Sequence, residues 1–289
     1  MKAAFKTYLE LCKTRIAFAA ALSAVLGYLL AASEIGWQVG IFIPGVFILA
    51  CGALVLNQCQ EKELDALMPR TCGRPLPSGR ITPFAALLFA LLLIVSGLLL
   101  LLTGGGLPEA VLGLLALLWY NGVYTLLKRK SAFAVVPGGL TGAVPPAIGW
   151  LAGGGGLEDY KLLVVVFFFF LWQVPHSWLL MTCYGEDYKR AGLPTLNDHF
   201  SSGQIKRIIF SWLFATAVSG LILAAMGFVH YPVSYGALFA LSSWLVWGGL
   251  KPLVYGTGAN IPIPVFKQTN YYLLGVLLFM SADKLIYSF

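Results

Sequence analysis

Long uninterrupted apolar runs constrain this chain more than any other feature of its sequence. The runs Phe84–Leu102 and Leu162–Leu180 contain no Asp, Glu, Lys or Arg. Each is close to the roughly 20 residues that an α-helix needs to cross the hydrocarbon core of a bilayer. Only 11% of the 289 residues are charged, whereas a soluble domain carries about 25%. The sequence therefore predicts an integral membrane protein and argues against a water-soluble globular domain.

Hydropathy predicts an all-α integral membrane fold, a bundle of about nine transmembrane helices. No separate soluble domain, linker or low-complexity tail is apparent, so we expect residues 1–289 to form one helical unit. The expected spans are residues 14–33, 37–56, 84–103, 107–127, 133–152, 161–183, 206–228, 232–250 and 269–288.

Lysine and arginine are distributed very unequally between the two sides that nine spans define. All but two of the 19 fall on the side of the N-terminus, and only Lys161 and Lys284 fall on the other. The positive-inside rule makes the basic side, and with it the N-terminus, cytoplasmic. Basic loops beside a bilayer meet anionic lipid head groups, so the net charge of +7 requires no nucleic-acid partner.

The segment after the second span combines acidic, amide and guanidinium groups. Asn57, Glu61 and Asp65 are spaced at i, i+4 and i+8, which places them on one face if the span continues as a helix. Mg²⁺ takes one or two carboxylates and completes its shell with water and substrate phosphates. Arg70 and Arg74 follow closely and suit diphosphate oxygens. The pattern predicts a metal–diphosphate site with a cytoplasm-facing opening, and a solvated helix end remains the alternative.

Two further segments on the same side carry candidate functional groups. Lys128-Arg129-Lys130 is either a second cationic element of the site or an orientation anchor. The Gly- and Pro-rich stretch 137–146 predicts close helix packing or an irregularity beside a cavity.

The sixth predicted span contains a histidine just before its cytoplasmic end. A polar residue such as His176 in an apolar span usually faces the bundle interior and marks function, although a structural histidine is the alternative. Pro175 is expected to loosen the helix at this point. Glu186 and Asp187 form a second acidic pair, which we expect to face the first across the cytoplasmic mouth. Charges in a solvated loop are the alternative.

Taken together, these segments resemble the UbiA-type intramembrane prenyltransferases, and within them the haem-modifying branch. They occur in the family's order from the second span to the loop after the sixth. This sequence departs from the family pattern at Glu61 (usually Asp), Ser177 (usually Phe), Thr195 (usually Met) and Asn197 (usually Pro). The matching elements are Asn57-x₃-Glu61-x₃-Asp65-x₂-Met68-x-Arg70-Thr71-x₂-Arg74-Pro75-Leu76, Tyr124-Thr125-x₂-Lys128-Arg129, Gly138-Gly139-x₂-Gly142-Ala143-x-Pro145-Pro146, Trp172-Gln173-x-Pro175-His176-x-Trp178 and Asp187-Tyr188-x₂-Ala191-Gly192-x-Pro194.

The resemblance implies a Mg²⁺-dependent transfer of farnesyl from farnesyl diphosphate to a vinyl group of haem B, with addition of water. It further implies that a single transmembrane prenyltransferase domain acts in the lipid bilayer, and that a downstream haem-modifying or oxidase-assembly protein receives the product. The implied catalytic residues are Asn57, Glu61, Asp65 and His176, of which His176 would face the haem. The implied metal ligands are Asn57, Glu61, Asp65 and Asp187. The implied diphosphate-binding residues are Arg70, Arg74, Tyr124, Lys128, Arg129, Tyr188 and Lys189.

Two other functions remain open on the sequence alone. One is a prenyltransferase with another acceptor, such as an aromatic quinone precursor. The other is a non-enzymatic transporter, but transporters often show internal repeats and charges near the midplane, and neither is seen here. The N-terminal residues resemble neither a cleaved signal peptide nor a mitochondrial-type leader, so we expect a plasma (inner) membrane location.

Overall fold

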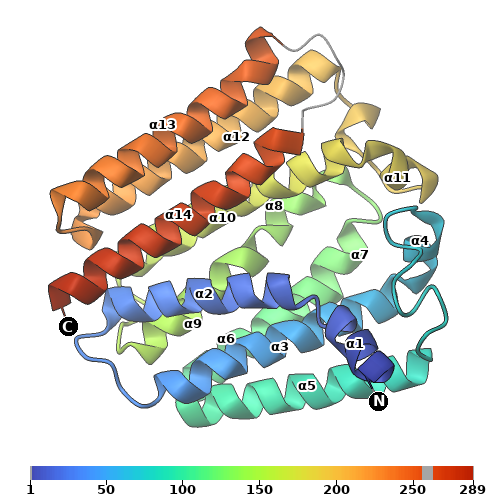
Figure 1. The fold of residues 1–289 in the computed structure, drawn as a ribbon, viewed down its shortest axis with the longest axis horizontal. Helices are drawn as coiled ribbons and strands as arrows, with labels where there is room; N and C mark the ends of the chain where they lie inside the picture. Colours follow the sequence, from blue (N-terminus) through green and yellow to red (C-terminus); the bar gives the residue numbers. More distant parts are fainter. Residues whose placement is uncertain (1, 256–262, 289) are drawn as a thin grey trace.

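The computed structural model of the chain describes residues 2–255 and 263–288. All regular structure within these ranges is helical, and the long helices lie side by side in one bundle (Figure 1). The predicted all-α fold class is therefore confirmed.

Eight helical segments of the described residues are long and apolar enough to cross a bilayer. The ninth predicted span corresponds to α14 (Ile263–Ser288), which has 26 residues but is not among those eight. A count of nine spans therefore stays a prediction. The eight are α2 (Thr14–Ala31), α3 (Val39–Gln60), α5 (Pro83–Gly104), the run Leu107–Leu127, the run Ala132–Ala152, α10 (Tyr160–Cys183), the run Ser202–Phe228 and α13 (Pro232–Val254).

Three of the eight segments consist of several consecutive elements. The run 107–127 contains α6 (Leu107–Leu117), the π-helix η1 (Leu118–Tyr124) and α7 (Thr125–Leu127). The run 132–152 contains η2 (Ala132–Ala134), α8 (Val135–Gly138) and α9 (Leu140–Ala152). The run 202–228 contains α12 (Ser202–Leu223) and η4 (Ala224–Phe228).

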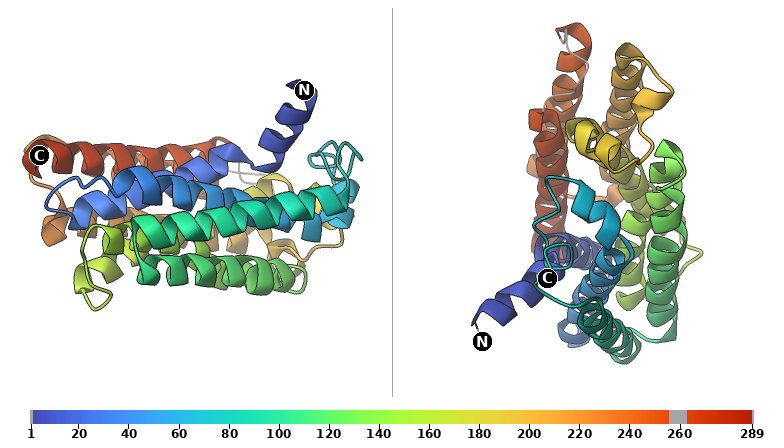
Figure 2. Two further views of the ribbon diagram at one scale, coloured as in Figure 1. Left: turned by 90° about the horizontal axis from the view of Figure 1, so that it is seen from below. Right: turned by 90° about the vertical axis from the view of Figure 1, so that its right-hand side faces the viewer.

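The short helices α1 (Lys2–Leu11), α4 (Lys62–Leu67) and α11 (Gly185–Arg190) lie at one end of the bundle, on the right in Figure 1. We call this end the α4–α11 end. Helix α1 leaves the bundle at a steep angle, so that the N-terminus projects from it (Figure 2). The loops that carry the predicted site residues thus come together at the same end.

The second predicted span extends further than hydropathy alone indicated. Helix α3 ends at Gln60, so Asn57 is helical, and Glu61 (φ −109°, ψ 10°) separates α3 from α4. The Glu61 N–H donates to the Asn57 carbonyl at 3.0 Å, and the Asp65 N–H donates to the Glu61 carbonyl at 2.8 Å. The i, i+4 hydrogen bonding therefore persists across the interruption, as the spacing of the three residues required.

The helices pack as two groups that meet along α2 and α9. Helix α3 packs along α5 and α2 packs along α9, whereas α10, α12, α13 and α14 pack against one another. Contacts of α2 with α14 and of α9 with α10 join the groups. On the outside, α5 exposes Leu88, Leu92, Val95 and Leu99 at helical spacing. These side chains form a surface suited to lipid.

Glycines permit the close approach of α2 and α9. A Cβ atom on Gly149 would lie 1.9 Å from the Ala24 carbonyl oxygen, and one on Gly27 would lie 2.0 Å from the Pro146 carbonyl oxygen. Small residues at such contacts let helix backbones approach within a membrane, where packing rather than the hydrophobic effect drives association.

The α2–α9 contact yields a prediction about stability. Replacing Gly149 by Ala should force the two backbones apart and destabilise the protein by about 1–3 kcal/mol. The matched control is Gly236→Ala in α13, where an added Cβ has no atom within 4 Å. Thermal unfolding in detergent should show a lower midpoint for the first variant only. Equal midpoints for both variants would contradict this account.

Candidate active site

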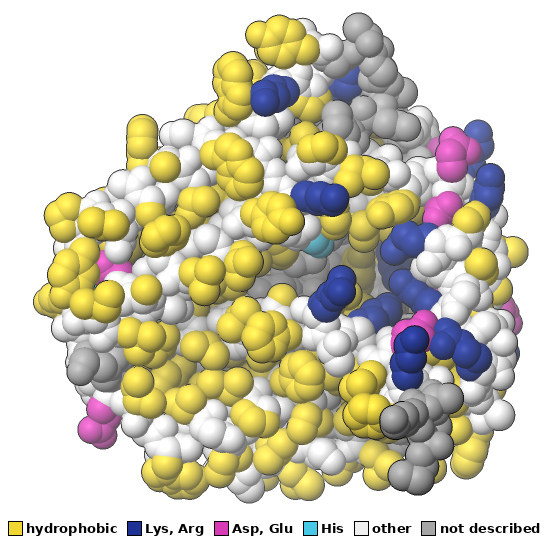
Figure 3. Space-filling model, in the orientation of Figure 1, with side chains coloured by type: hydrophobic (Ala, Val, Ile, Leu, Met, Phe, Trp, Pro, Cys, Tyr) yellow, Lys and Arg dark blue, Asp and Glu magenta, His cyan; other side chains and the backbone are white. Residues whose placement is uncertain are grey.

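A cavity of about 210 Å³ opens at the α4–α11 end and contains most of the predicted site residues. Figure 3 shows Lys and Arg side chains gathered around a hollow in this part of the face. The cavity brings together segments that are far apart in the sequence. They are α3, α4 and the loop after it, η1, Lys128 directly after α7, and α11. The predicted residues in its wall are Asn57, Glu61, Asp65, Arg70, Arg74, Tyr124, Lys128 and Tyr188.

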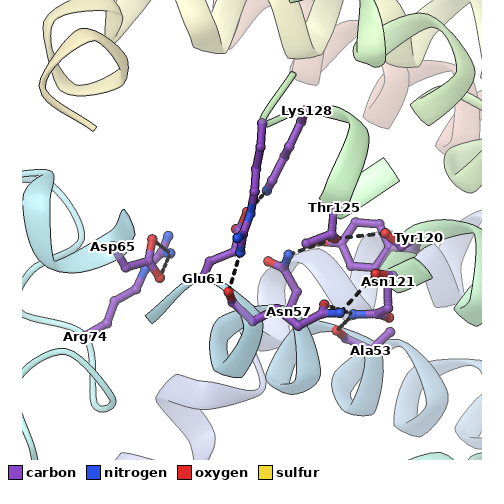
Figure 4. A network of polar contacts seen from close by, with 11 residues as sticks. Ala53, Asn57, Glu61, Asp65, Arg74, Tyr120, Asn121, Thr125 and Lys128 are labelled. Atoms are coloured by element: carbon purple, nitrogen blue, oxygen red, sulfur yellow. Dashed lines mark hydrogen bonds and ion pairs between the residues drawn. The ribbon is translucent and has the colours of Figure 1, made fainter. Parts of the chain in front are cut away.

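Each of the two carboxylates in the wall is paired with a cation. Arg74 Nη1 lies 2.8 and 2.7 Å from the two carboxylate oxygens of Asp65, which is 2% exposed. Lys128 Nζ lies 2.5 Å from Glu61 Oε1 (Figure 4). These pairs hold oppositely charged groups in position around the cavity.

Cations outnumber carboxylates in the wall. Arg70, whose guanidinium also lies 4.7 Å from the centre of the Tyr184 ring, has no ion pair among the described residues. Lys13 likewise lines the cavity without a carboxylate within ion-pair distance in that part of the chain. A surplus of positive charge in a cavity wall, here from the exposed Arg70 and the half-buried Lys13, favours a polyanionic ligand such as a diphosphate.

Lys13 is a charged residue of this site that the sequence analysis missed, since it counted that lysine only as an orientation charge. Lys13 connects α1 to α2 and is the one non-glycine residue with a left-handed backbone (φ 44°) in the described ranges. Such strained conformations cluster at functional sites. Burial, together with the nearby Arg74 and Lys128, lowers the pKa of Lys13 to about 7. A lysine directly before an apolar span carries no sequence signal that separates these two roles.

Tyrosine side chains complete the wall. The Tyr120 and Tyr124 rings stack at 5.8 Å, and Lys128 Nζ lies 5.5 Å from the centre of the Tyr124 ring. Burial raises the pKa of Tyr188 in α11, so its hydroxyl stays protonated at neutral pH and can donate a hydrogen bond.

The structure does not bring Arg129, Asp187 and Lys189 into this cavity. All three line a neighbouring hollow of about 760 Å³, which shares Leu193 and Pro194 with the cavity wall. The expectation that Asp187 faces the first acidic group across a common mouth is not met by this geometry. Its position follows from α11, which places Asp187 toward the hollow and Tyr188 toward the cavity.

His176 also lies outside the cavity wall, although its neighbour Ser177 is part of it. The His176 ring stacks on Trp172 at a centroid distance of 4.6 Å and contacts Phe266 at 5.1 Å in a tilted arrangement (39°). Its Nδ1 is buried without a hydrogen-bond partner among the described residues. Helix α10 continues through Pro175. The Leu171 carbonyl, which the proline leaves unpaired, accepts a hydrogen bond from the Thr216 hydroxyl at 3.0 Å.

The donor atoms at the cavity fit Mg²⁺ only together with a phosphate ligand. Asn57, Glu61 and Asp65 provide one amide and two carboxylates, and the described residues contain no cluster of three His, Cys, Asp or Glu side chains that could hold a metal alone. Mg²⁺ commonly keeps water and substrate phosphates in its shell. The set therefore fits a metal that is bound jointly with a diphosphate rather than a metal held by a complete protein cage.

Comparison with known proteins identifies the family of the chain. The model of the UbiA prenyltransferase family matches residues 20–258. The chain belongs to the UbiA prenyltransferase family. It is therefore a multi-pass membrane protein and a prenyltransferase, which sets aside the transporter alternative.

Curated relatives in the UbiA family cover most of the chain. A protoheme IX farnesyltransferase of Oleidesulfovibrio alaskensis is 35% identical over 281 residues, which are 96% of this chain and 96% of that protein. A protoheme IX farnesyltransferase of Geobacter sulfurreducens is 40% identical over 219 residues, which are 76% of this chain and 81% of that protein.

Solved structures of distant sequence share the UbiA fold. A digeranylgeranylglyceryl phosphate synthase superposes with a TM-score of 0.77 at 17% sequence identity. The superposition covers 98% of this chain and 99% of the synthase chain. A UbiA homologue from Archaeoglobus fulgidus, bound to GPP and Mg²⁺, superposes with a TM-score of 0.71 at 14% sequence identity. The superposition covers 96% of this chain and 99% of the homologue's chain.

Lys13 yields a prediction about pH. Its folded-state pKa of about 7 lies below the usual 10.5, so the unfolded chain binds more protons between these values. Wild-type stability should therefore fall as pH decreases from 10.5 to 7. Lys13→Met removes this effect and should be more stable than the wild type near pH 7, with a difference that shrinks toward pH 10.

Thermal unfolding midpoints in detergent at several pH values check this. Lys6→Met, at an exposed position of α1, serves as the control and should show no such trend. A difference between Lys13→Met and wild type that is the same at all pH values would overturn the assignment.

Proposed function

We propose that the protein transfers a farnesyl group from farnesyl diphosphate to a vinyl group of haem B and thereby makes haem O, in a Mg²⁺-dependent reaction. The observation that carries the proposal is the cation-rich cavity with its three oxygen-donor residues. It occurs in a chain that is 35% identical, over 96% of both lengths, to a protoheme IX farnesyltransferase.

The chain's own residues would bind and stabilise the diphosphate. Arg70, Arg74, Lys128 and Lys13 surround the cavity and would neutralise negative charge that grows on the diphosphate as the allylic C–O bond breaks. Such preorganised electrostatic stabilisation is usually the largest catalytic contribution. Bound Mg²⁺, held by Asn57, Glu61 and Asp65, would add Lewis-acid neutralisation of the same oxygens.

The reaction needs a polar and an apolar part of the same site. The electron pair of the broken C–O bond stays on the diphosphate, and the terminal vinyl carbon of haem B bonds to C1 of the farnesyl group. Water then adds to the adjacent, porphyrin-stabilised carbocation, and the released proton balances the additional charge on the free diphosphate. Ile16, Leu180 and Met181 line the cavity beside the charged residues and would limit access of bulk water to the allylic cation.

His176 is our candidate for a haem-facing residue. Its ring stacks on Trp172, has a tilted contact with Phe266 and has an unpartnered Nδ1, while Ser177 is part of the cavity wall. A flat aromatic surface with one free ring nitrogen suits contact with a porphyrin. We place Arg129 and Lys189, with Asp187, on the approach to the cavity, because they line the adjoining hollow.

The proposal extends to the location of the reaction. The excess of Lys and Arg near the cavity supports a cytoplasmic N-terminus and a cytoplasm-facing site in the plasma (inner) membrane. We further propose that residues 1–289 act as one prenyltransferase domain, and that a downstream haem-modifying or oxidase-assembly protein receives the haem O.

An assay with defined substrates tests the proposed reaction. Purified protein incubated with haem B, farnesyl diphosphate and Mg²⁺ should form a farnesylated, hydrated haem, which mass spectrometry detects. Product should be absent when EDTA replaces Mg²⁺. No product from wild type, beside an active control enzyme, would exclude haem B as acceptor, and aromatic quinone precursors would then be offered to the same preparation.

The carboxylate of Asp65 allows a sharper test within α4. Asp65→Ala should lower turnover at least about a hundredfold, because it removes a group that acts on the developing charge. Glu63→Ala is the matched control, since Glu63 is exposed on the same short helix and is absent from the cavity wall. Both variants should remain folded in detergent. Near-normal turnover of Asp65→Ala would disprove the metal assignment.

A further inference from the structure

The helical run 107–127, which contains Tyr124 and ends just before Lys128, includes a π-helical segment that contacts α3 near Asn57. At the end of η1, the N–H of Thr125, the first residue of α7, donates to the Tyr120 carbonyl five residues earlier. The Thr125 hydroxyl donates to the same carbonyl at 2.9 Å. Wide turns of this kind inside α-helices are frequent at functional sites. Here the turn brings a threonine hydroxyl to the interface with α3.

The polarity of the hydrogen bonds at Thr125 determines how the Asn57 amide is oriented. A carbonyl oxygen can only accept, so the single hydroxyl proton of Thr125 is directed to Tyr120. Thr125 Oγ1 is then an acceptor toward Asn57, and Asn57 Nδ2 donates to it at 3.1 Å (Figure 4). Both side chains are buried, with exposed fractions of 0% and 2%. The amide nitrogen of Asn57 must therefore face Thr125.

This orientation leaves the oxygen of Asn57 available. Asn57 is part of the cavity wall, and its Oδ1 has no hydrogen-bond partner in the described part of the chain. A cation binds the amide oxygen and is repelled by the amide NH₂ group. A rotated amide would present the wrong atom, so the hydroxyl of Thr125 selects the productive orientation.

A second contact fixes the register of the same two helices. Asn121 Nδ2 in η1 donates to the Ala53 carbonyl and to Gln60 Oε1, each at 3.1 Å, and Gln60 Nε2 donates to the Asn121 carbonyl at 3.0 Å. These bonds hold α3 against η1 on either side of the Asn57–Thr125 contact. Thr125 is thereby kept opposite Asn57.

We propose that Thr125 is a positioning residue for Mg²⁺, which acts by orienting the Asn57 carboxamide so that Oδ1 faces the cavity. This inference rests on the proposed function, because it assumes that Asn57 binds a divalent cation together with a diphosphate. Partners that orient a metal ligand typically change metal affinity about 10–100-fold when they are removed.

Binding of Mn²⁺ as a probe for Mg²⁺ tests the proposal without turnover. Free Mn²⁺ is measured by electron paramagnetic resonance in the presence of farnesyl thiodiphosphate, an unreactive analogue. Thr125→Val keeps the side-chain shape but removes the hydroxyl, and it should weaken Mn²⁺ binding about tenfold or more. Thr125→Ser restores the hydroxyl and should bind nearly as the wild type does. Thr125→Ala also removes the hydroxyl but, unlike Thr125→Val, puts no methyl group in its place, and it should weaken Mn²⁺ binding to a similar degree.

Two controls separate positioning from a general structural effect. Thr216→Val removes a hydroxyl of α12 that is as buried as that of Thr125 and also contacts backbone carbonyls. Thr216 lies outside the cavity wall, so this variant should leave Mn²⁺ binding unchanged. In an Asn57→Ala background, Thr125→Val should cause no further loss, because Thr125 acts through Asn57.

The outcomes distinguish this inference from the proposed function. If Thr125→Val and Thr125→Ala both bind Mn²⁺ with wild-type affinity, the positioning role is overturned while the metal site stands. The same holds if Thr125→Val weakens Mn²⁺ binding as much in the Asn57→Ala background as in the wild type. Failure of the wild type to bind Mn²⁺ with the analogue overturns the metal site, and the positioning role with it.

Discussion

Because lipid hydrocarbon offers no hydrogen-bond partner, every backbone N–H and C=O of a spanning segment must be satisfied within the protein. This constraint accounts for the continuous helices and for the way their irregularities are handled. Pro175 leaves the Leu171 carbonyl without its helical partner, and the Thr216 hydroxyl of α12, which the Trp212 carbonyl shares, supplies one. The π-helical turn η1 is reinforced in the same manner by the hydroxyl of Thr125. In both places a threonine makes an irregular helix compatible with the bundle.

The same constraint confines the chemistry to one end of the molecule. Charged groups are costly in hydrocarbon, so the carboxylates and cations that the site needs gather where α3 continues into α4 and where α7 ends. Ion pairs of Asp65 with Arg74 and of Glu61 with Lys128 hold these segments together. The surplus of cations suits a polyanionic ligand, and apolar residues such as Ile16, Leu180 and Met181 line the same cavity.

Close helix packing connects the spanning region to this end. Glycines let α2 approach α9 and let α3 approach α5, where a Cβ on Gly97 would lie 2.6 Å from the Leu49 nitrogen. Helix positions defined by backbone contact leave little freedom for sliding. The residues of α3 that face η1 therefore keep one register, on which the Asn57–Thr125 contact depends.

Local properties of the sequence determined the multi-pass membrane character and the all-α class. The spacing of Asn57, Glu61 and Asp65 also predicted a common face, because helical periodicity needs only neighbouring residues. Which distant segments meet was decided by tertiary packing alone. Packing added Lys13 to the cavity, placed Asp187 in the adjoining hollow, and set Thr125 against Asn57. These relations depend on contacts between helices many residues apart, for which a single sequence carries no periodic signal.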